Sequence, residues 1–200
     1  MRCARFVASL AALVFPVAIA AGGQVASPVV KTSLSSEDQK IIRSFQSTAK
    51  SYVATGHNAP SDAKLKPTTD IAELEKNRRA LRQLVVAARP NAKQGDLFTP
   101  PVSELFRRLM AQAMDGPDGN EVRRSLQDAE PVAAAEAAQI AVNRDYPNQN
   151  GQPLQSEPAT FLQCLPLLPK GLEYRMVGNI LVLRDTEANL VVDYLPRAYK

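Results

Sequence analysis

The chain of 200 residues has no tryptophan, one histidine and only two cysteines. His57, Cys3 and Cys164 are too few to form a zinc or nickel site from imidazole and thiolate ligands, which takes about four ligands. The sequence also lacks a G-x-S-x-G elbow, a glycine-rich phosphate loop and an H-E-x-x-H motif. These absences exclude the enzyme classes with the clearest signatures. We therefore predict no catalytic residue, no metal ligand and no cofactor from sequence motifs.

A strong excess of one charge is missing as well. There are 24 Lys and Arg against 20 Asp and Glu, a net charge of +4. Without Arg2 and Arg5, which lie in the leader described next, the balance is 22 minus 20, or +2. Binding to nucleic acid needs a marked basic surface, so no nucleic-acid partner is predicted.

Residues 1–21 have the order of a secretory signal peptide. Two arginines are followed by an apolar run from residue 6 to 21 and then by small residues, with Ala18-Ile19-Ala20 as a cleavage site. The run has 16 residues and contains Pro16, whereas crossing a bilayer takes about 20 apolar residues. Cleavage is therefore favoured over a retained membrane anchor, and no later run is long enough to span. The mature protein is expected to be periplasmic or secreted.

After an extended lead-in, residues 22–34, the next part of the chain has helical periodicity. The spacing of apolar residues and the capping residues predict four helices in the region 35–147, at about 35–56, 69–89, 100–114 and 117–128. The alanine-rich stretch 131–147 fits either a helix or an extended segment, and both stay open. The composition of residues 148–158 is typical of a linker.

Residues 159–200 change to a strand pattern. Three segments rich in β-branched and aromatic residues, at 174–177, 180–185 and 190–194, predict short strands, and Gly178-Asn179 is typical of a tight hairpin. The predicted fold class is α+β, with an N-terminal helical region of about four helices followed by a three-stranded antiparallel β meander. Both faces of the middle segment carry apolar residues, so we expect the meander to pack on the helices.

Two kinds of residue remain as candidates for chemistry. Cys164 lies among leucines and Phe161, which favours a buried core cysteine over a reactive thiol. Glu173, Asp185 and Asp193 lie on or beside the meander, and two carboxylates in different environments can act as acid and base. A hydrolase of this kind needs a pocket that holds two such acids, at least one of them buried.

Three arginine doublets, at 78–79, 107–108 and 123–124, each follow an acidic residue by about one helical turn. That spacing is typical of ion pairs on an exposed helix face. The alternative is a basic surface for an acidic partner, a lipid headgroup or a polyanionic wall component, together with an exposed apolar patch near Phe98. The residues that this alternative assigns to partner binding are Phe98, Arg107, Arg108, Arg123 and Arg124.

The stretches "QGDLFTPPV" (94–102) and "LPLLPKGLEYRMVGNILVLRDTEANLVVDYLPRA" (165–198) resemble a family of exported bacterial proteins to which no activity is assigned. The resemblance covers about residues 34–198 and implies export and the same architecture. In the first motif the matching residues are Gly95, Asp96, Phe98, Thr99 and Pro100. In the second they are Tyr174, Arg175, Gly178, Leu183, Arg184, Asp185, Ala188, Asn189, Leu190 and Asp193.

These observations favour a non-enzymatic exported protein that binds another macromolecule of the cell envelope, either a protein or a polyanionic component. The alternatives are a small carboxylate-dependent hydrolase and a carrier of a small ligand. The carrier would need a cavity between the helices and the sheet.

Overall fold

The computed structural model describes residues 34–57, 68–124, 126, 139–149, 152–153 and 159–199. All of them belong to one compact unit, residues 32–200. The expected leader and its cleavage site lie outside the described residues, as does the expected lead-in except for Leu34. Of the stretch that fits helix or strand equally well, residues 131–138 also lie outside. Residues 139–147 are not helical and form turns and a single bridge from Asp145 to Leu190.

Three long helices precede the sheet: α1 (Ser36–His57), α2 (Ile71–Ala88) and α3 (Pro100–Met114). Residues 119–124 are helical as well, and α5 (Ala159–Leu162) is one short turn. Helix α2 begins after Asp70, whose Oδ1 accepts the backbone N–H of Ala72 at 2.8 Å. This contact satisfies one of the free donors at the start of a helix. Helix α3 begins with two prolines, which suit a first turn because their missing N–H would have no helical partner there.

The C-terminal sheet has the order β3 (Leu172–Val177), β4 (Ile180–Asp185) and β5 (Leu190–Leu195), all antiparallel. Gly178 has a φ of 56° at the first position of the two-residue link, as in a type II′ hairpin turn. The predicted α+β class, with about four helices and then a three-stranded meander, is therefore confirmed. The sequence did not indicate the short pair β1 (Asn148–Gln149) and β2 (Gln152–Pro153) inside the stretch assigned to a linker.

A β-bulge in β5 sets which side chains face the helices. Leu183 pairs with Asp193, whereas the next residue, Arg184, pairs with Val191, so Val192 is an extra residue in β5. Val192 and Leu195 both belong to the main core, while Tyr194 packs on the opposite face. Counted from Val192, simple alternation would put Asp193 on the opposite face of the sheet, where Tyr194 packs. The bulge instead places it on the face of the main core, beside Val192.

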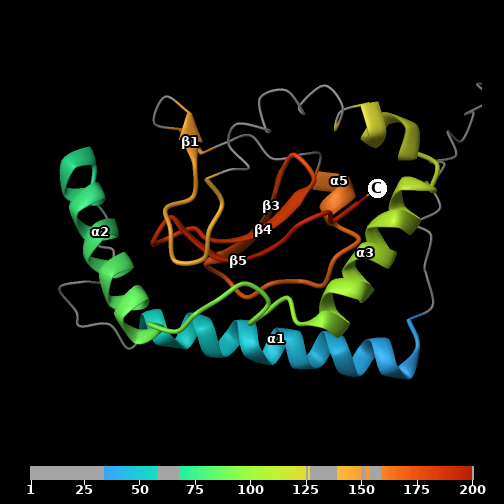
Figure 1. The fold of residues 1–200 in the computed structure, drawn as a ribbon. Helices are drawn as coiled ribbons and strands as arrows, with labels where there is room; N and C mark the ends of the chain where they lie inside the picture. Colours follow the sequence, from blue (N-terminus) through green and yellow to red (C-terminus); the bar gives the residue numbers. More distant parts are fainter. Residues whose placement is uncertain are drawn as a thin grey trace, which may run out of the picture. The chain divides into compact units, whose positions relative to one another are not determined.

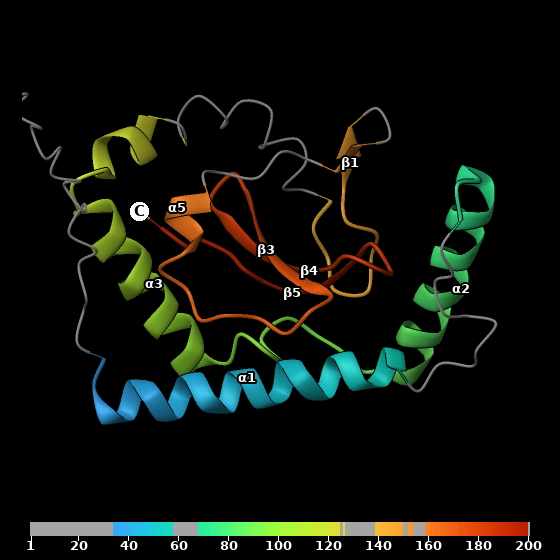
Figure 2. The same cartoon turned by 180° about the vertical axis from the view of Figure 1, so that it is seen from behind.

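The helices surround one face of the sheet. Helix α1 lies along the bottom of the view in Figure 1 and contacts both α2 and α3. Helix α2 stands near one end of α1, and α3 stands toward the other end. The view from behind shows the same arrangement (Figure 2). The main core lies between these helices and the sheet, and a smaller cluster lies on the opposite face of the sheet. Both faces of the sheet therefore carry buried apolar residues, as expected for a meander that packs on helices.

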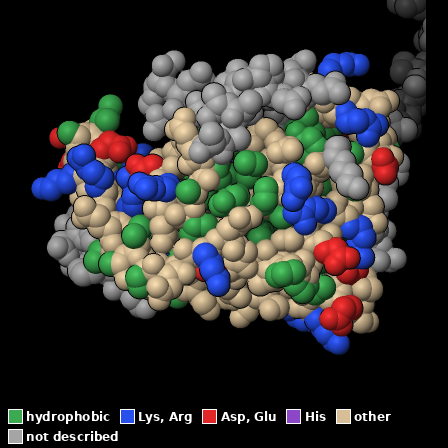
Figure 3. Space-filling model, viewed as in Figure 1, with side chains coloured by type: hydrophobic (Ala, Val, Ile, Leu, Met, Phe, Trp, Pro, Cys, Tyr) green, Lys and Arg blue, Asp and Glu red, His purple; other side chains and the backbone are tan. Residues whose placement is uncertain are grey.

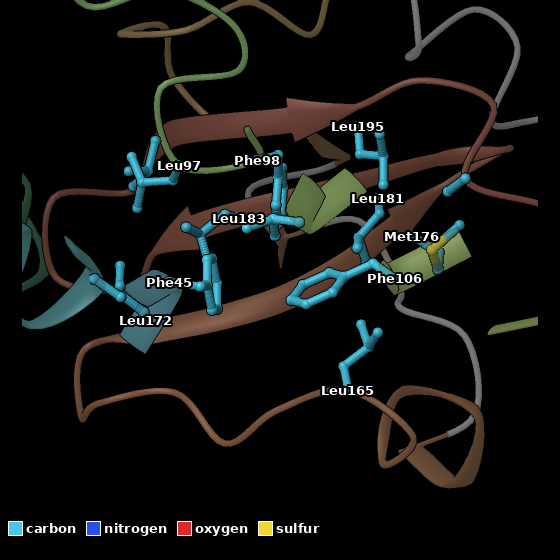
Figure 4. Packing of buried hydrophobic residues seen from close by; sticks show 14 of the residues in the cluster. Phe45, Leu97, Phe98, Phe106, Leu165, Leu172, Met176, Leu181, Leu183 and Leu195 are labelled. Atoms are coloured by element: carbon cyan, nitrogen blue, oxygen red, sulfur yellow. The ribbon is translucent and has the colours of Figure 1, made fainter. Parts of the chain in front are cut away.

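Aromatic rings form the centre of the main core (Figure 4). Phe45 of α1 stacks on Phe98 with ring centroids 6.0 Å apart, and Phe106 of α3 meets both rings edge-on, at 5.1 and 5.7 Å. Tyr174 of β3 meets Phe106 at 6.0 Å. The rings therefore join α1, the loop before α3, α3 itself and the sheet in one contact network.

Candidate functional site

Asp193 is the most completely enclosed carboxylate in the described structure, with 0% of its surface exposed. Its Oδ1 accepts the backbone N–H of Gly95 at 2.9 Å and that of Tyr194 at 2.8 Å. Its Oδ2 accepts the backbone N–H of Leu97 and of Phe98, each at 2.8 Å. One side chain of β5 thus holds the loop before α3, which carries the "GDLFTP" motif.

Two opposing effects act on the pKa of Asp193. Burial raises the pKa of this carboxyl, whereas the hydrogen bonds from Phe98, Gly95, Leu97 and Tyr194 lower it. The effect of burial is larger, so the pKa of Asp193 lies above its usual value. Because four donors occupy both oxygens and no surface is exposed, Asp193 cannot reach a substrate in this conformation. Its contacts serve to position the loop.

Asp185 joins the sheet to α1. Its Oδ2 accepts the hydroxyl of Tyr52 at 2.8 Å, and its Oδ1 accepts the backbone N–H groups of Glu187 and Ala188, each at 2.8 Å. The Arg89 guanidinium lies 4.9 Å from the centre of the Tyr52 ring. Burial and the Asp185 carboxylate raise the pKa of Tyr52, so its hydroxyl stays protonated and continues to donate.

Glu173 lies in a charged cluster on the other face of the sheet. Its carboxylate accepts Arg175 through Nε at 2.8 Å and Nη2 at 2.9 Å, and Arg184 through Nη1 at 2.6 Å. Arg184 also donates to Asn189 Oδ1 at 3.0 and 2.7 Å. Burial alone would raise the pKa of Glu173, but the two arginines outweigh it and lower the pKa below its usual value. This cluster ties β3, β4 and the turn before β5 together.

A small cleft lies where α1, α2 and two turns of the chain meet, with a volume of about 130 Å³. We call it the turn cleft, and it is lined by Tyr52, Val53, Leu81, Lys170, Gly171, Asp185 and Glu187. Of the three carboxylates selected from the sequence, only Asp185 lies here. Glu187, which the sequence did not single out, is the second acid. Asp185 is buried, and its two oxygens already accept three hydrogen bonds from within the chain. Glu187 is exposed to solvent.

Three of the four arginines proposed for partner binding make bonds within the chain. Arg107 donates from Nε to the Arg197 carbonyl and from Nη2 to the Pro196 carbonyl, both at 2.9 Å. Arg108 pairs with Asp38 of α1. Both side chains are partly open to solvent, but these contacts give Arg107 and Arg108 a structural role.

Arg123 donates to the Met114 carbonyl at 2.7 Å and to Asn120 at 2.8 Å. Arg124 is exposed, and no described residue forms an ion pair or hydrogen bond with it. Arg78 of the first doublet pairs with Glu75 at 3.0 Å, the one-turn spacing expected for a helix face.

Phe98 requires a correction. Only 2% of its surface is exposed, and it packs against Phe45 and Phe106 in the main core. The hypothesis that Phe98 forms part of a partner-binding surface is therefore wrong for this conformation. Its backbone N–H is bonded to the buried Asp193 carboxylate, and its ring is enclosed by those of Phe45 and Phe106. The large apolar side chains that are exposed in the described chain are Leu34, Ile71, Leu84 and Leu167.

Cys164 is half-buried and packs against the main core, and burial raises the pKa of its thiol to about 11. It is therefore protonated and weakly nucleophilic at neutral pH, as a core cysteine would be. The side chain of His57 lies outside the described residues. Within the described ranges, no three acids, cysteines or histidines converge to form a metal site. No helix in those ranges combines the length and apolar character needed to cross a bilayer.

Comparison of the chain with protein-family models, with curated proteins and with solved structures finds no match. The geometry of the chain's own residues therefore carries the interpretation of its function.

Proposed function

We propose that the chain is an exported, non-enzymatic binding protein that contacts another macromolecule of the cell envelope, either a protein or a polyanionic component. The observation that carries the proposal is the state of the three carboxylates best placed for acid or base chemistry. Asp193, Asp185 and Glu173 accept four, three and three hydrogen bonds from within the chain. Acids held in this way support the fold and are poorly placed to exchange protons with a substrate.

The charges on the surface favour a partner that contacts a few residues over one attracted by a large basic patch. Figure 3 shows acidic and basic side chains interspersed on one face, with a hydrophobic area near its centre. Among the arginines considered for partner binding, Arg124 is the one whose guanidinium no described residue engages. A charged partner could therefore bind Arg124 without breaking a bond that the fold uses. Arg124 is our first candidate for the contact.

The test is chemical crosslinking of the full chain, tagged at its C-terminus, in its own cells, followed by capture of the tag. The Arg124→Glu variant reverses an exposed charge, and Arg79→Glu makes the same change at an exposed arginine of α2. We expect one discrete partner that is captured by the wild type and by Arg79→Glu but is reduced with Arg124→Glu. Equal recovery with all three proteins would reject Arg124 as the contact. Capture of background proteins alone would reject the binding function.

A further inference from the structure

The turn cleft has walls that are fixed by hydrogen bonds between two turns. In the first turn, Leu172 donates its N–H to the Pro169 carbonyl at 3.2 Å, and Gly171 has a φ of 93°, as in a type II turn with Lys170 at its tip. In the second turn, Thr186 donates its N–H to the Gly171 carbonyl at 2.9 Å and its hydroxyl to the same oxygen at 3.2 Å. The backbone of Lys170 is thereby held at a fixed position relative to that of the second turn.

The second turn is fixed in the same manner. Asp185 accepts the backbone N–H of Glu187, the next acid along the chain, at 2.8 Å, and it is anchored to α1 through Tyr52. Lys170 and Glu187 thus extend from two backbone segments that cannot move independently. A cleft with walls held in this way loses little conformational entropy when a ligand enters.

The charges that line the turn cleft are of opposite sign and are not neutralised by each other. Lys170 and Glu187 are both exposed, and neither belongs to an ion pair formed by described residues. Asp185 adds a second carboxylate to the anionic side. Val53 and Leu81 give the cleft an apolar part. A complementary ligand therefore carries one positive group, one negative group and a small apolar body.

The volume limits the size of that ligand. A cavity of about 150 Å³ accommodates one benzene molecule, and the turn cleft, at about 130 Å³, is slightly smaller. A free amino acid with a short side chain is of this size, since L-alanine has as many non-hydrogen atoms as benzene. A peptide or a sugar ring with substituents would extend out of the cleft.

We propose that the turn cleft binds a small zwitterion, a free amino acid with a short apolar side chain. Its carboxylate contacts the Lys170 ammonium, and its ammonium contacts the carboxylates of Glu187 and Asp185. Its side chain lies against Val53 and Leu81. This site is separate from Arg124, so the inference stands or falls independently of the proposed macromolecular partner.

The test is an NMR titration of the isotopically labelled full chain with L-alanine, observing backbone amides. We expect saturable shifts in the millimolar range at Gly171, Thr186 and Glu187. Propionate lacks the ammonium and ethylamine lacks the carboxylate, so each should cause smaller shifts that do not saturate in that range. The absence of saturable shifts at these three amides with L-alanine would overturn the proposal.

Variants separate this site from weak binding elsewhere. Lys170→Gln and Glu187→Gln each remove one charge, and each should weaken L-alanine binding about fivefold, the effect of losing one exposed ion pair. Lys93→Gln removes an exposed lysine from a different turn and should leave binding unchanged. Binding that is unaffected by Lys170→Gln and Glu187→Gln, or equally weakened by Lys93→Gln, would overturn the assignment.

Discussion

The Asp193 carboxylate accepts the backbone N–H of Phe98 at 2.8 Å, across 95 residues of the chain. This bond joins the two stretches that stand out in the sequence, "GDLFTP" before α3 and the closing segment of the sheet. In the closing segment, Arg184 bonds to Glu173 and Asn189, and Asp185 bonds to Tyr52. Asp193 and Asp185 therefore join the sheet to the loop before α3 and to α1, while Arg184 joins the strands on the outer face of the sheet.

Replacing Phe98 distinguishes a core role from a surface role. Phe98→Ala removes a ring packed against Phe45 and Phe106, and the resulting cavity should lower the free energy of unfolding by about 3–5 kcal/mol. Urea denaturation measures the loss. Leu167 is 86% exposed, so Leu167→Ala is a matched control and should change stability by less than about 0.5 kcal/mol. A loss for Phe98→Ala as small as that of the control would contradict the core assignment.

Removing the Tyr52 hydroxyl tests the link between α1 and the sheet. Tyr52→Phe deletes a hydrogen bond to a buried carboxylate and should cost about 1.5–3 kcal/mol, the range for bonds to charged groups. Tyr194→Phe is the control, because the described residues make no hydrogen bond to its half-buried hydroxyl. Thermal or urea unfolding of the two variants gives the comparison. Equal stability of the two would show that the Asp185 bond contributes little.

The charged cluster on the outer face of the sheet predicts a pH dependence. The pKa of Glu173 is lowered in the folded protein from a reference value of 4.5. A carboxyl with a lowered folded pKa contributes stability above its unfolded pKa, and that stability is lost as the pH falls through the folded pKa. Wild type should therefore be more stable than Glu173→Gln at neutral pH, and the difference should shrink below about pH 4.5.

The control for this pH dependence is Glu104→Gln. Glu104 is exposed, and it belongs to no ion pair of the described residues. Its substitution should give a small difference that hardly changes with pH. Urea unfolding of wild type and the two variants between neutral and acidic pH measures both trends. A Glu173→Gln difference that is independent of pH, or that grows on acidification, would refute the role assigned to the arginines.

Local patterns in the sequence predicted the three long helices and the three strands of the C-terminal sheet, though not the short β1–β2 pair. The stripe of apolar residues in α3 and the alternation in β4 depend on neighbours a few residues away, and both elements have the predicted bounds, Pro100–Met114 and Ile180–Asp185. The tight turn at Gly178 also follows from local chemistry. Propensity and periodicity act over such short separations, so the sequence alone sufficed here.

Long-range contacts could not be predicted in the same manner. Nothing near Asp193 in the sequence indicates a bulge that turns it toward Gly95 and Phe98, and Tyr52 is 133 residues from its partner Asp185. The same limit explains the error at Phe98, since the rings that enclose it, Phe45 and Phe106, come from α1 and α3 and not from its own loop. For the turn cleft, the only local signal was the Lys170-Gly171 pair, typical of a turn tip.

The most direct test of the central claim, that Asp193 holds the motif-bearing loop in place, is the free energy of unfolding of Asp193→Asn. The amide offers one acceptor oxygen where the carboxylate offers two, so backbone donors of the loop lose their partners in a buried site, at about 1–3 kcal/mol each. Asp96→Asn is the matched control, an exposed acid in the same loop that accepts only the Lys93 N–H. We expect Asp193→Asn to lose about 2–5 kcal/mol and Asp96→Asn less than about 1 kcal/mol. Equal, small losses for both variants would contradict the claim.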